Sequence, residues 1–590
     1  METTESKQPD ADVLLSIENL SVALPGGGDR KYAVHDLSLQ LKRGETVCIV
    51  GESGSGKSVT AHAVMRLLPP GGLRLESGVI RFDGQDILKM SDAQVRQMRG
   101  ARISMIFQEP MTALNPVMRV GDQIAEALRV HGVRDRAEQQ RRVVDLLADM
   151  KLPEPETLQY SYPFQLSGGQ RQRVMIAMAM VSRPALLIAD EPTTALDVTT
   201  QAQILKLLND LKQRYNMGLL FITHDFGVVA DIADRVAVMQ AGRLVELGER
   251  EKVLQSPEHP YTKKLIAAVP RLRTDAEEVL RQDPLLEIRN VNKTYRPRAS
   301  KWFGNAERLQ VLNGVDLRIH RGEIMGLLGE SGSGKTTLGH CVAKLIPIDS
   351  GEVRFEGRDI TGMDYKAFRP LRPRIQMIFQ DPYSSLNPRH RVGRIITENA
   401  LLNGVPKDVA NRRMMEVLEL VGLDASAVDR LPHEFSGGQR QRIGIARALV
   451  MEPSLIVADE PVSALDVSVQ QQVLELLRKV RERYGLSMLF ITHDLRIASQ
   501  ICDRIAIMQR GRIVECQTAG DIYRNPQHAY TRELIASMPG RMVESGALAD
   551  GEAGAVATLS AAAAKGPAGA SRQGIGTLAF QGLQGSSSSI

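Results

Sequence analysis

Two segments of the sequence could hold the phosphates of a nucleotide, and they are nearly identical. GESGSGKS at residues 51–58 and GESGSGKT at residues 329–336 both fit the pattern G-x-x-x-x-G-K-[ST]. Its glycines let backbone N–H groups turn toward phosphate oxygens, its lysine adds a positive charge, and its last hydroxyl can bind Mg²⁺. We predict that these loop residues contact a nucleotide: Gly51, Ser53, Gly54, Gly56, Lys57, Ser58, Gly329, Ser331, Gly332, Gly334, Lys335 and Thr336.

Downstream of each loop, an apolar run ends in a pair of carboxylates. The pairs are Asp190 with Glu191 and Asp459 with Glu460. We expect the aspartate of each pair to hold Mg²⁺ and the glutamate to orient or deprotonate an attacking water. His224 and His493, in identical FITHD segments, could reach a γ-phosphate and hold the geometry for hydrolysis. Together these residues indicate the hydrolysis of a nucleoside triphosphate.

The spacing of these motifs shows an internal repeat. Each SGGQ serine precedes the aspartate of its acidic pair by 23 residues, and each of those aspartates precedes the FITHD histidine by 34 residues. A repeat of about 270 residues is a duplication of a whole domain and is too long for the unit of a solenoid. Two sites of the same kind are therefore expected in one chain.

Apolar patterns predict the elements that carry these motifs. Runs at 45–50 and 323–328 read as strands before the phosphate loops, and runs at 185–190 and 454–459 read as strands before the acidic pairs. Between them, segments such as 137–150 and 409–421 have the pattern of amphipathic helices. Alternating strands and helices predict an α/β fold.

LSGGQRQR at 166–173 and FSGGQRQR at 435–442 are the most discriminating segments. A serine and two glycines before a helix form an anion site that lacks a lysine of its own, so the anion must be held mainly by other groups. With these motifs the chain resembles a tandem ATP-binding subunit of an ABC transporter from residue 14 to residue 539. The resemblance implies ATP and Mg²⁺ as ligands, and an α/β fold of two P-loop NTPase domains. Each domain would have a RecA-like core, an antiparallel β subdomain and a helical subdomain.

In that family two such domains pack head to tail. Each signature segment then closes over the nucleotide on the other domain's phosphate loop, so the functional dimer would form within this one chain. The implied composite sites join Lys57 with Ser436 and Gly438, and Lys335 with Ser167 and Gly169. The neighbouring glycines of the two signatures complete this set: Gly168 and Gly437.

Other positions gain a role only through the resemblance. Gln108 and Gln380 match the glutamine that touches Mg²⁺ or the attacking water, and Asp197 and Asp466 match the loop that communicates across the dimer. Tyr295 stands where the family stacks an aromatic ring on adenine. The first half has Leu24 there, so we expect apolar contact, or Tyr32, to hold adenine instead. Both glutamates, both histidines and both signatures are intact, which predicts two hydrolytic sites.

The segments after each core indicate a branch of the family. SPEHPYTKKLIAAVP at 256–270 and NPQHAYTRELIASMP at 525–539 resemble the C-terminal extension of oligopeptide and dipeptide importer ATPases, including those for glutathione. We expect these segments only to pack at a domain edge. The resemblance implies two membrane-spanning permease subunits and an extracytoplasmic substrate-binding protein as partners. The alternatives are a soluble tandem ABC ATPase acting on ribosomes or DNA, and an exporter ATPase, although neither a long charged linker nor a zinc-type cysteine cluster is present.

Composition limits the remaining possibilities. With 590 residues, 43% hydrophobic content and a net charge of +5, the chain can form two buried cores and lacks the strong positive charge of a nucleic-acid binder. Four scattered cysteines favour reduced, buried thiols over a metal or iron–sulfur site. No apolar run is long enough for a membrane helix. Any membrane role must therefore come from partners, and the resemblance to importer ATPases implies a peripheral protein on the cytoplasmic face of the inner membrane.

Composition also suggests the domain limits. We expect two nucleotide-binding domains at 14–255 and 285–524, followed by an extension with a linker at 256–284 and a second extension at 525–543. The termini, 1–13 and 544–590, have the composition of disordered tails, the latter rich in Ala, Gly and Ser.

Overall fold

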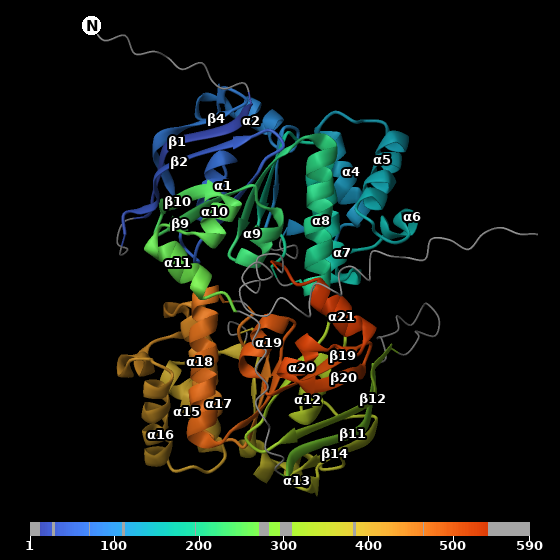
Figure 1. The fold of residues 1–590 in the computed structure, drawn as a ribbon, viewed down its shortest axis with the longest axis vertical. Helices are drawn as coiled ribbons and strands as arrows, with labels where there is room; N and C mark the ends of the chain where they lie inside the picture. Colours follow the sequence, from blue (N-terminus) through green and yellow to red (C-terminus); the bar gives the residue numbers. More distant parts are fainter. Residues whose placement is uncertain are drawn as a thin grey trace, which may run out of the picture. The chain divides into compact units, whose positions relative to one another are not determined.

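Strands with both faces apolar alternate with amphipathic helices in each half of the computed structural model (Figure 1). The structure describes residues 12–25, 30–69, 71–108, 113–194, 196–270, 283–295, 309–381, 385–463 and 465–540. The predicted N-terminal tail up to residue 11, residues 271–282 of the linker segment, residues 296–308, and the C-terminal tail lie outside these residues.

The first half contains two sheets. One is antiparallel with the order β2-β1-β4-β5, and the other has the order β10-β9-β3-β8-β7-β6, in which only β10 runs antiparallel to its neighbour. The strands are β1 (Val13–Ala23), β2 (Tyr32–Lys42), β3 (Thr46–Val50), β4 (Arg74–Phe82), β5 (Gln85–Asp86), β6 (Ile103–Ile106), β7 (Leu186–Asp190), β8 (Gly218–Thr223), β9 (Arg235–Gln240) and β10 (Arg243–Glu249).

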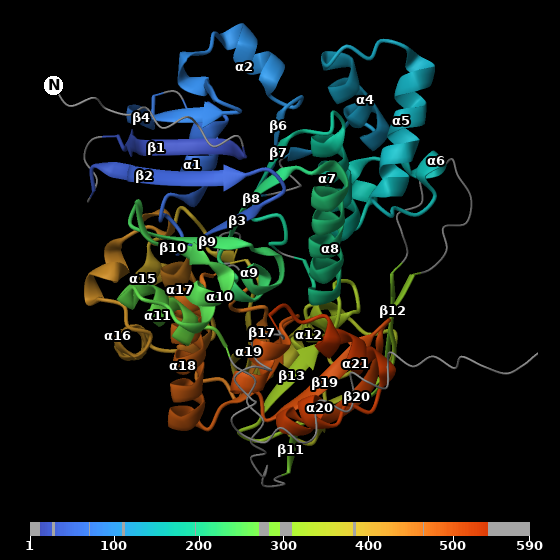
Figure 2. The same ribbon diagram turned by 45° about the horizontal axis from the view of Figure 1, so that its top comes forward.

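Helices of the first half surround the second of these sheets and form a separate group beside it. In Figures 1 and 2, α4, α5 and α6 form a group that lies away from the antiparallel sheet. Helices α7 and α8 lie between that group and the sheet. The helices are α1 (Lys57–Val64), η1 (Ile87–Lys89), α2 (Asp92–Met98), α4 (Val120–Val130), α5 (Arg136–Asp149), α6 (Pro155–Leu158), η2 (Pro163–Gln165), α7 (Gly168–Met180), α8 (Val198–Tyr215), α9 (Phe226–Ile232), α10 (Arg250–Gln255) and α11 (Pro260–Ala267).

The second half repeats both sheets. Their orders are β12-β11-β14-β15 and β16-β17-β18-β13-β19-β20, the second being the order of the first half read from the other edge. The strands are β11 (Pro284–Tyr295), β12 (Leu309–His320), β13 (Ile324–Leu328), β14 (Ser350–Phe355), β15 (Arg358–Asp359), β16 (Ile375–Ile378), β17 (Leu455–Asp459), β18 (Ser487–Ile491), β19 (Arg504–Gln509) and β20 (Arg512–Thr518).

The longer helices of the second half follow the order of the first half, whereas some of the short helical turns differ in type. The helices of the second half are α12 (Lys335–Val342), α13 (Tyr365–Phe368), η3 (Arg369–Arg374), α15 (Val392–Leu402), α16 (Lys407–Leu420), η4 (Ala425–Asp429), η5 (Pro432–Glu434), α17 (Gly437–Leu449), α18 (Val467–Tyr484), α19 (Leu495–Ile501), α20 (Ala519–Arg524) and α21 (Ala529–Ala536). The predicted α/β fold is confirmed, and each half has the expected mainly parallel core, antiparallel sheet and helical group.

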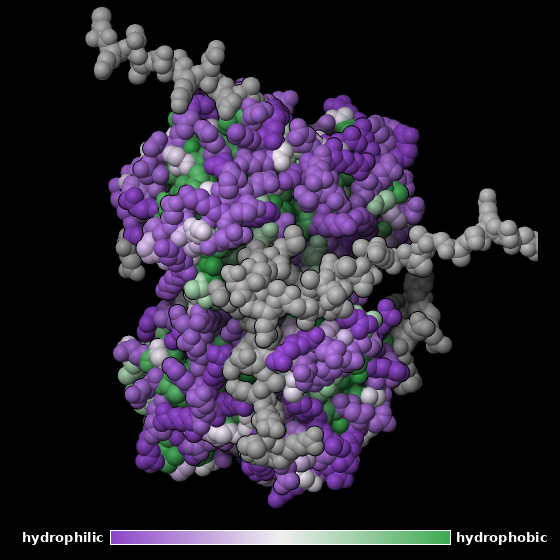
Figure 3. All heavy atoms as spheres, viewed as in Figure 1, coloured by the Kyte–Doolittle hydropathy of each residue, from purple (hydrophilic) through white to green (hydrophobic). Residues whose placement is uncertain are grey.

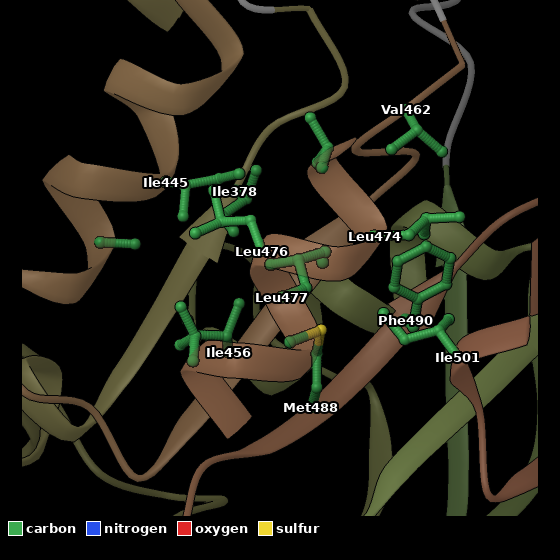
Figure 4. Packing of buried hydrophobic residues seen from close by; sticks show 14 of the residues in the cluster. Ile378, Ile445, Ile456, Val462, Leu474, Leu476, Leu477, Met488, Phe490 and Ile501 are labelled. Atoms are coloured by element: carbon green, nitrogen blue, oxygen red, sulfur yellow. The ribbon is translucent and has the colours of Figure 1, made fainter. Parts of the chain in front are cut away.

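Buried parallel strands fix where the motifs lie. Every residue of β3, β7 and β8 is buried, as is every residue of β13, β17 and β18, which explains their uninterrupted apolar sequences. Figure 4 shows how Leu477, Met488 and Phe490 pack together with neighbouring aliphatic side chains of the second half. Because these parallel strands end at one edge of each sheet, the loops that follow them converge there.

Candidate nucleotide-binding sites

The two phosphate loops have the same strained backbone. Gly51 and Gly329 have φ values of 152° and 153°, and a Cβ on either would lie 2.2 or 2.1 Å from a carbonyl oxygen of the adjacent strand. Gly56 and Gly334, just before the helices, are also left-handed. Only glycine fits these positions, so the loops expose their N–H groups as the sequence pattern requires.

Each loop lysine is buried and already bound to its own loop. Lys57 Nζ donates to the carbonyl oxygens of Gly51 and Glu52 at 2.7 and 3.1 Å. In the second half, Lys335 Nζ donates to Gly329 and Glu330 at 2.7 and 2.9 Å. Burial lowers the pKa of both ammonium groups, which the nearby carboxylates oppose. A phosphate would offer these charges a stronger acceptor than the peptide oxygens they bind here.

Next to each loop, a hydroxyl and a carboxylate form a pair of hard oxygen ligands. Ser58 Oγ donates to Asp190 Oδ1 at 3.0 Å, and Thr336 Oγ1 donates to Asp459 Oδ1 at 3.2 Å. Both aspartates are almost fully buried, and burial raises their pKa, that of Asp459 to about 6. A buried carboxylate with a raised pKa favours a cation beside it, and oxygen ligands of this kind suit Mg²⁺.

In the first half, Glu191 is held by three side chains. Its carboxylate oxygens lie 3.2 Å from His224 Nδ1, 3.1 Å from Gln108 Nε2 and 3.0 Å from Thr194 Oγ1. Burial raises the pKa of Glu191, but the hydrogen bond from His224 and the charges of His224 and Lys57 outweigh it and bring the pKa to about 2. Glu191 is therefore ionised at neutral pH and can accept a proton or orient a water.

The second half assembles its own set around Glu460. Gln380 Nε2 donates to Glu460 Oε2 at 2.8 Å, and His493 Nδ1 lies 3.1 Å from Oε1. Burial raises the pKa of Glu460, but the hydrogen bond and charge of His493, together with the charge of Lys335 and the hydrogen bond from Gln380, outweigh burial and lower it. Burial lowers the pKa of both histidines, but the partner glutamates raise it above the ordinary value.

Both glutamates have a left-handed backbone. Their φ values are 47° for Glu191 and 46° for Glu460, and each N–H donates at 2.9 Å to a carbonyl oxygen near the end of the neighbouring strand, that of Ile222 or Ile491. Such a conformation is uncommon for a residue with a Cβ and costs on the order of 1 kcal/mol. The hydrogen bond to the neighbouring strand therefore helps to offset the free-energy cost of this backbone conformation and fixes each carboxylate at the end of its strand.

The signature segments begin two long helices. Ser167 and Ser436 are the N-caps of α7 and α17, and each forms a capping box with a glutamine three residues later. Gly168, Gly169, Gly437 and Gly438 form the first turns. A Cβ on Gly169 would lie 2.6 Å from Thr200, and one on Gly438 2.5 Å from Val469, so the second glycine of each signature lets α7 or α17 approach the next long helix closely.

Polar contacts run from each half to the phosphate loop of the other. Asp466 Oδ1 accepts hydrogen bonds from Ser53 N and Oγ at 3.1 and 3.0 Å, and Ser468 Oγ donates to Glu52 at 2.6 Å. In the opposite direction, Thr199 Oγ1 lies 2.9 Å from a carboxylate oxygen of Glu330 and 2.7 Å from Asp197 Oδ1, so its one proton is shared between the two carboxylates.

The contacts from the first half to the phosphate loop of the second half also include Asp197, the other aspartate that the resemblance singled out. Asp197, which caps α8, has its pKa lowered because hydrogen bonds, including one from the backbone of Ser331, outweigh burial. The loops expected from the resemblance to communicate across the two halves therefore lie against phosphate loops, with Gly54 and Gly332 next to the contacted serines.

The residues expected to contact adenine, Tyr295 in the second half and Leu24 or Tyr32 in the first, lie on or next to the antiparallel sheets. Tyr295 is 41% exposed, and Lys293 Nζ lies 5.8 Å from the centroid of its ring. In the first half, Leu24 N bonds to Lys31 O, which brings Tyr32 next to the position of Leu24. The Tyr32 ring stacks on His35 at a centroid distance of 4.5 Å. An aromatic surface is available in each half, but it comes from different strands.

The structure also brings in residues that sequence reasoning did not select. Arg496 of the second half pairs with Asp225 of the first at 3.4 Å, and a cavity of about 100 Å³ lined by both site histidines lies beside them. Tyr261 and Tyr530, from the C-terminal extensions, reach the phosphate loops. One signal in the sequence could have found them: each tyrosine lies 37 residues beyond the FITHD histidine of its half.

Among the described residues, no group of three or more His, Cys, Asp or Glu side chains could hold a metal ion, and none of their helices is long and apolar enough to cross a membrane. Cys48, Cys341 and Cys502 are buried, as expected, whereas Cys516 is only partly buried. Figure 3 shows a face on which polar residues dominate and apolar residues are scattered.

This combination of phosphate loop, acidic pair and signature helix defines a class of ATP-binding cassette proteins. Residues 34–194 and 312–463 match the ABC transporter family, and residues 245–301 and 514–566 match the C-terminal region of oligopeptide/dipeptide transporters. The chain belongs to the ABC transporter family, as its resemblance predicted.

Two relatives illustrate this membership, and one similar solved structure is given after them. The chain is 46% identical to the peptidoglycan transport ATP-binding protein YejF of Agrobacterium fabrum, covering 90% of this chain and 97% of the relative. It is 45% identical to the glutathione import ATP-binding protein GsiA of Salmonella paratyphi A, covering 90% and 91%. A dimeric ATP-binding cassette bound to ADP and Pi is 28% identical, covering 40% of this chain and 98% of that one, with a TM-score of 0.36.

Proposed function

We propose that this protein is the ATP-hydrolysing subunit of an ABC importer for small peptides or peptide-like compounds, such as glutathione or peptidoglycan fragments. The observation that carries the proposal is a complete hydrolytic set in each half, together with an oligopeptide/dipeptide transporter region after each. Relatives of nearly the same length are ATP-binding proteins for glutathione import and peptidoglycan transport. Neither the ribosome-directed nor the exporter alternative has comparable support.

In the proposed mechanism, ATP binds where the loop N–H groups and Lys57 or Lys335 can receive its phosphates. Mg²⁺, when bound by Ser58, Asp190 and Gln108 or by Thr336, Asp459 and Gln380, supplies charge to the phosphate oxygens. Glu191 or Glu460 takes the proton of the attacking water, and His224 or His493 keeps that carboxylate oriented. General-base assistance of this kind is worth about 10²- to 10⁴-fold.

We further propose that the two halves form the functional dimer within one chain. The contacts of Asp466 with Ser53 and of Thr199 with Glu330 support this head-to-tail arrangement. In the closed state Ser436 and Gly438 would meet the nucleotide on Lys57, and Ser167 and Gly169 the nucleotide on Lys335. Gln108 and Gln380 follow edge strands, where two permease subunits on the cytoplasmic face of the inner membrane could reach them.

Uptake in cells tests the transport proposal. Cells that carry the chain, its permeases and its binding protein would be given labelled glutathione, a panel of small peptides and labelled peptidoglycan fragments. The double variant Glu191→Gln with Glu460→Gln should abolish uptake of the true cargo. Glu475→Gln, which removes an exposed carboxylate from α18, is the control and should leave uptake unchanged. Uptake of every compound that is equal in the double variant and the wild type would refute the proposal.

A further inference from the structure

The C-terminal extensions do more than pack at a domain edge, because one side chain from each reaches a phosphate loop. The hydroxyl of Tyr261 on α11 accepts a hydrogen bond from Glu52 N at 3.3 Å, and that of Tyr530 on α21 accepts one from Glu330 N at 3.0 Å. Both tyrosines are buried, 8% and 4% exposed. The same contact thus occurs twice, at equivalent positions of the repeat.

The peptide that each tyrosine contacts is the one that the loop lysine binds. The carbonyl of Gly51 accepts from Lys57 Nζ at 2.7 Å, while the N–H of the same peptide unit, which belongs to Glu52, donates to Tyr261. In the second half, Lys335 and Tyr530 hold the two ends of the Gly329–Glu330 peptide in the same way. When a phosphate draws the lysine away, the tyrosine remains as the partner that fixes this peptide.

The tyrosines are themselves placed by a short, repeated arrangement. Glu246 on β10 accepts hydrogen bonds from the backbone N–H groups of Glu258 and His259 at 2.8 and 3.1 Å. His259 Nδ1 then accepts from Tyr261 N at 3.2 Å and caps α11. This explains the HPYT sequence: the histidine begins the helix, and the tyrosine faces the loop.

The second half builds the same arrangement with different neighbours. Glu515 on β20 accepts from the N–H groups of Gln527 and His528 at 2.7 and 3.0 Å, and His528 Nδ1 accepts from Tyr530 N at 3.2 Å. Thr531 also donates to Glu515. The substitution of alanine for the helix proline, HAYT in place of HPYT, leaves the geometry unchanged.

On its other side, the residue contacted by each tyrosine meets the opposite half. The Glu52 carboxylate accepts from Ser468, and the Glu330 carboxylate lies 2.9 Å from the hydroxyl oxygen of Thr199. The second residue of each phosphate loop, Glu52 or Glu330, is therefore contacted on two sides. Its backbone N–H bonds to the extension of its own half, and its side chain meets the other half.

We propose that Tyr261 and Tyr530 are positioning residues of the two ATP sites, which fix the first peptide of each phosphate loop so that the lysine can move to the phosphates. This inference rests on the proposed function, since it assigns the extensions a role in ATP binding. The tyrosines touch the loop and not the reacting atoms, so they act through Lys57 and Lys335.

The test is ATP affinity of the purified full-length chain, measured with a fluorescent ATP analogue and Mg²⁺. Tyr261→Phe and Tyr530→Phe remove only the hydroxyl and keep the buried ring. Loss of one such hydrogen bond should weaken ATP binding to the affected site about three- to tenfold. In the assembled transporter, KM for ATP should rise by a similar factor while kcat stays within about twofold. Tyr484→Phe, which lies at the end of α18, is the matched control.

The outcomes separate this inference from the proposed function. Weaker binding by both phenylalanine variants, with an unchanged melting temperature and an unaffected control, supports the positioning role. Binding equal to wild type overturns it, and so does a loss of affinity that is accompanied by a melting temperature several degrees lower, because that reveals a structural role. If even the wild-type chain fails to bind the analogue, the proposed function fails instead.

Discussion

The two halves are alike where ATP chemistry would occur and in their contacts with the opposite phosphate loop, but they differ at one position where they face each other. Each glutamate is held by one glutamine and one histidine, with distances that differ by at most 0.3 Å. In contrast, the residue three positions after the histidine is Gly227 in the first half and Arg496 in the second. Duplication has preserved the reaction and changed the surface between the copies.

Arg496 uses the space that Gly227 leaves. Its guanidinium lies 3.4 Å from Asp225 of the first half and 3.6 Å from its own Asp494. A Cβ on Gly227 would lie only 2.6 Å from Arg496 Nη1 and 2.9 Å from the carbonyl oxygen of Pro539. A single-residue difference therefore produces a contact that runs in one direction only.

The largest expected effect tests whether the two sites are equivalent. Replacing both Glu191 and Glu460 by glutamine should lower the ATPase rate of the assembled transporter about 10²- to 10⁴-fold, because each loses its carboxylate base. If the sites work independently, each single variant keeps roughly half of the activity. A single variant as slow as the double would show that neither site turns over without the other. Steady-state phosphate release measures all three.

A second comparison concerns adenine. Replacing Tyr295 by alanine should weaken nucleotide binding in the second half about tenfold, as expected for loss of one ring stacked on a base. The reciprocal variant Leu24→Tyr should tighten the first site. Photolabelling with an azido-ATP, followed by mapping of the labelled half, measures each site separately. Unchanged labelling of the second half in Tyr295→Ala would rule out stacking.

The cross-half ion pair can be isolated by a double-mutant cycle. Arg496→Gln and Asp225→Asn should each lower stability, and their coupling energy should be about 1 kcal/mol because both groups are largely buried from solvent. The exposed pair Arg391–Asp429, 3.2 Å apart, is the control and should couple by less than about 0.5 kcal/mol. Denaturant unfolding measures both cycles. Equal coupling in the two would show that Arg496 adds no specific link.

The smallest effect is a pH dependence shared by both halves. The pKa of His224 is raised, so its contribution to stability is full below about 6.5 and is lost as the pH rises through the raised value. The pKa of Glu191 is lowered to about 2, so its contribution is full above about 4.5 and is lost as the pH falls toward 2.

The stability difference between wild type and the His224→Gln, His493→Gln variant should therefore be greatest between about pH 4.5 and 6.5, on the order of 1 kcal/mol. Melting temperatures of the wild type and the variant, recorded from about pH 3 to about pH 9, would show this stability difference. A difference that does not vary with pH would mean that the histidines are neutral in the folded protein.

Much of this arrangement could be predicted because local patterns dictate it. Buried parallel strands need continuous apolar residues, so the runs that end at Val50 and Asp190 mark the sheet edge at which the site lies. The glycines Gly51 and Gly329 are equally predictable, since a Cβ at either position would lie about 2 Å from a backbone carbonyl oxygen.

Other features could not be predicted because they depend on residues far apart in the chain. Tyr261 has the pattern of an ordinary helix residue, and only the fold brings its hydroxyl to Glu52, which lies 209 positions earlier. The role of Arg496 depends on the absence of a side chain at Gly227. The equal spacing of the two tyrosines from their FITHD histidines marks them as a repeated pair, but it does not show that they contact a phosphate loop.

The contact between Arg496 and Gly227 also bears on which half-molecules can associate. In a pair made of two second halves, each Arg496 would meet the Arg496 of the other copy. Two like charges would then meet at the place where Arg496 now lies against Gly227, which has no side chain. Two copies of the first half would leave each Asp225 without the guanidinium that now neutralises it. Covalent linkage keeps the right partner at an effective concentration in the millimolar range. Separately expressed halves should thus assemble as mixed pairs rather than as pairs of identical halves.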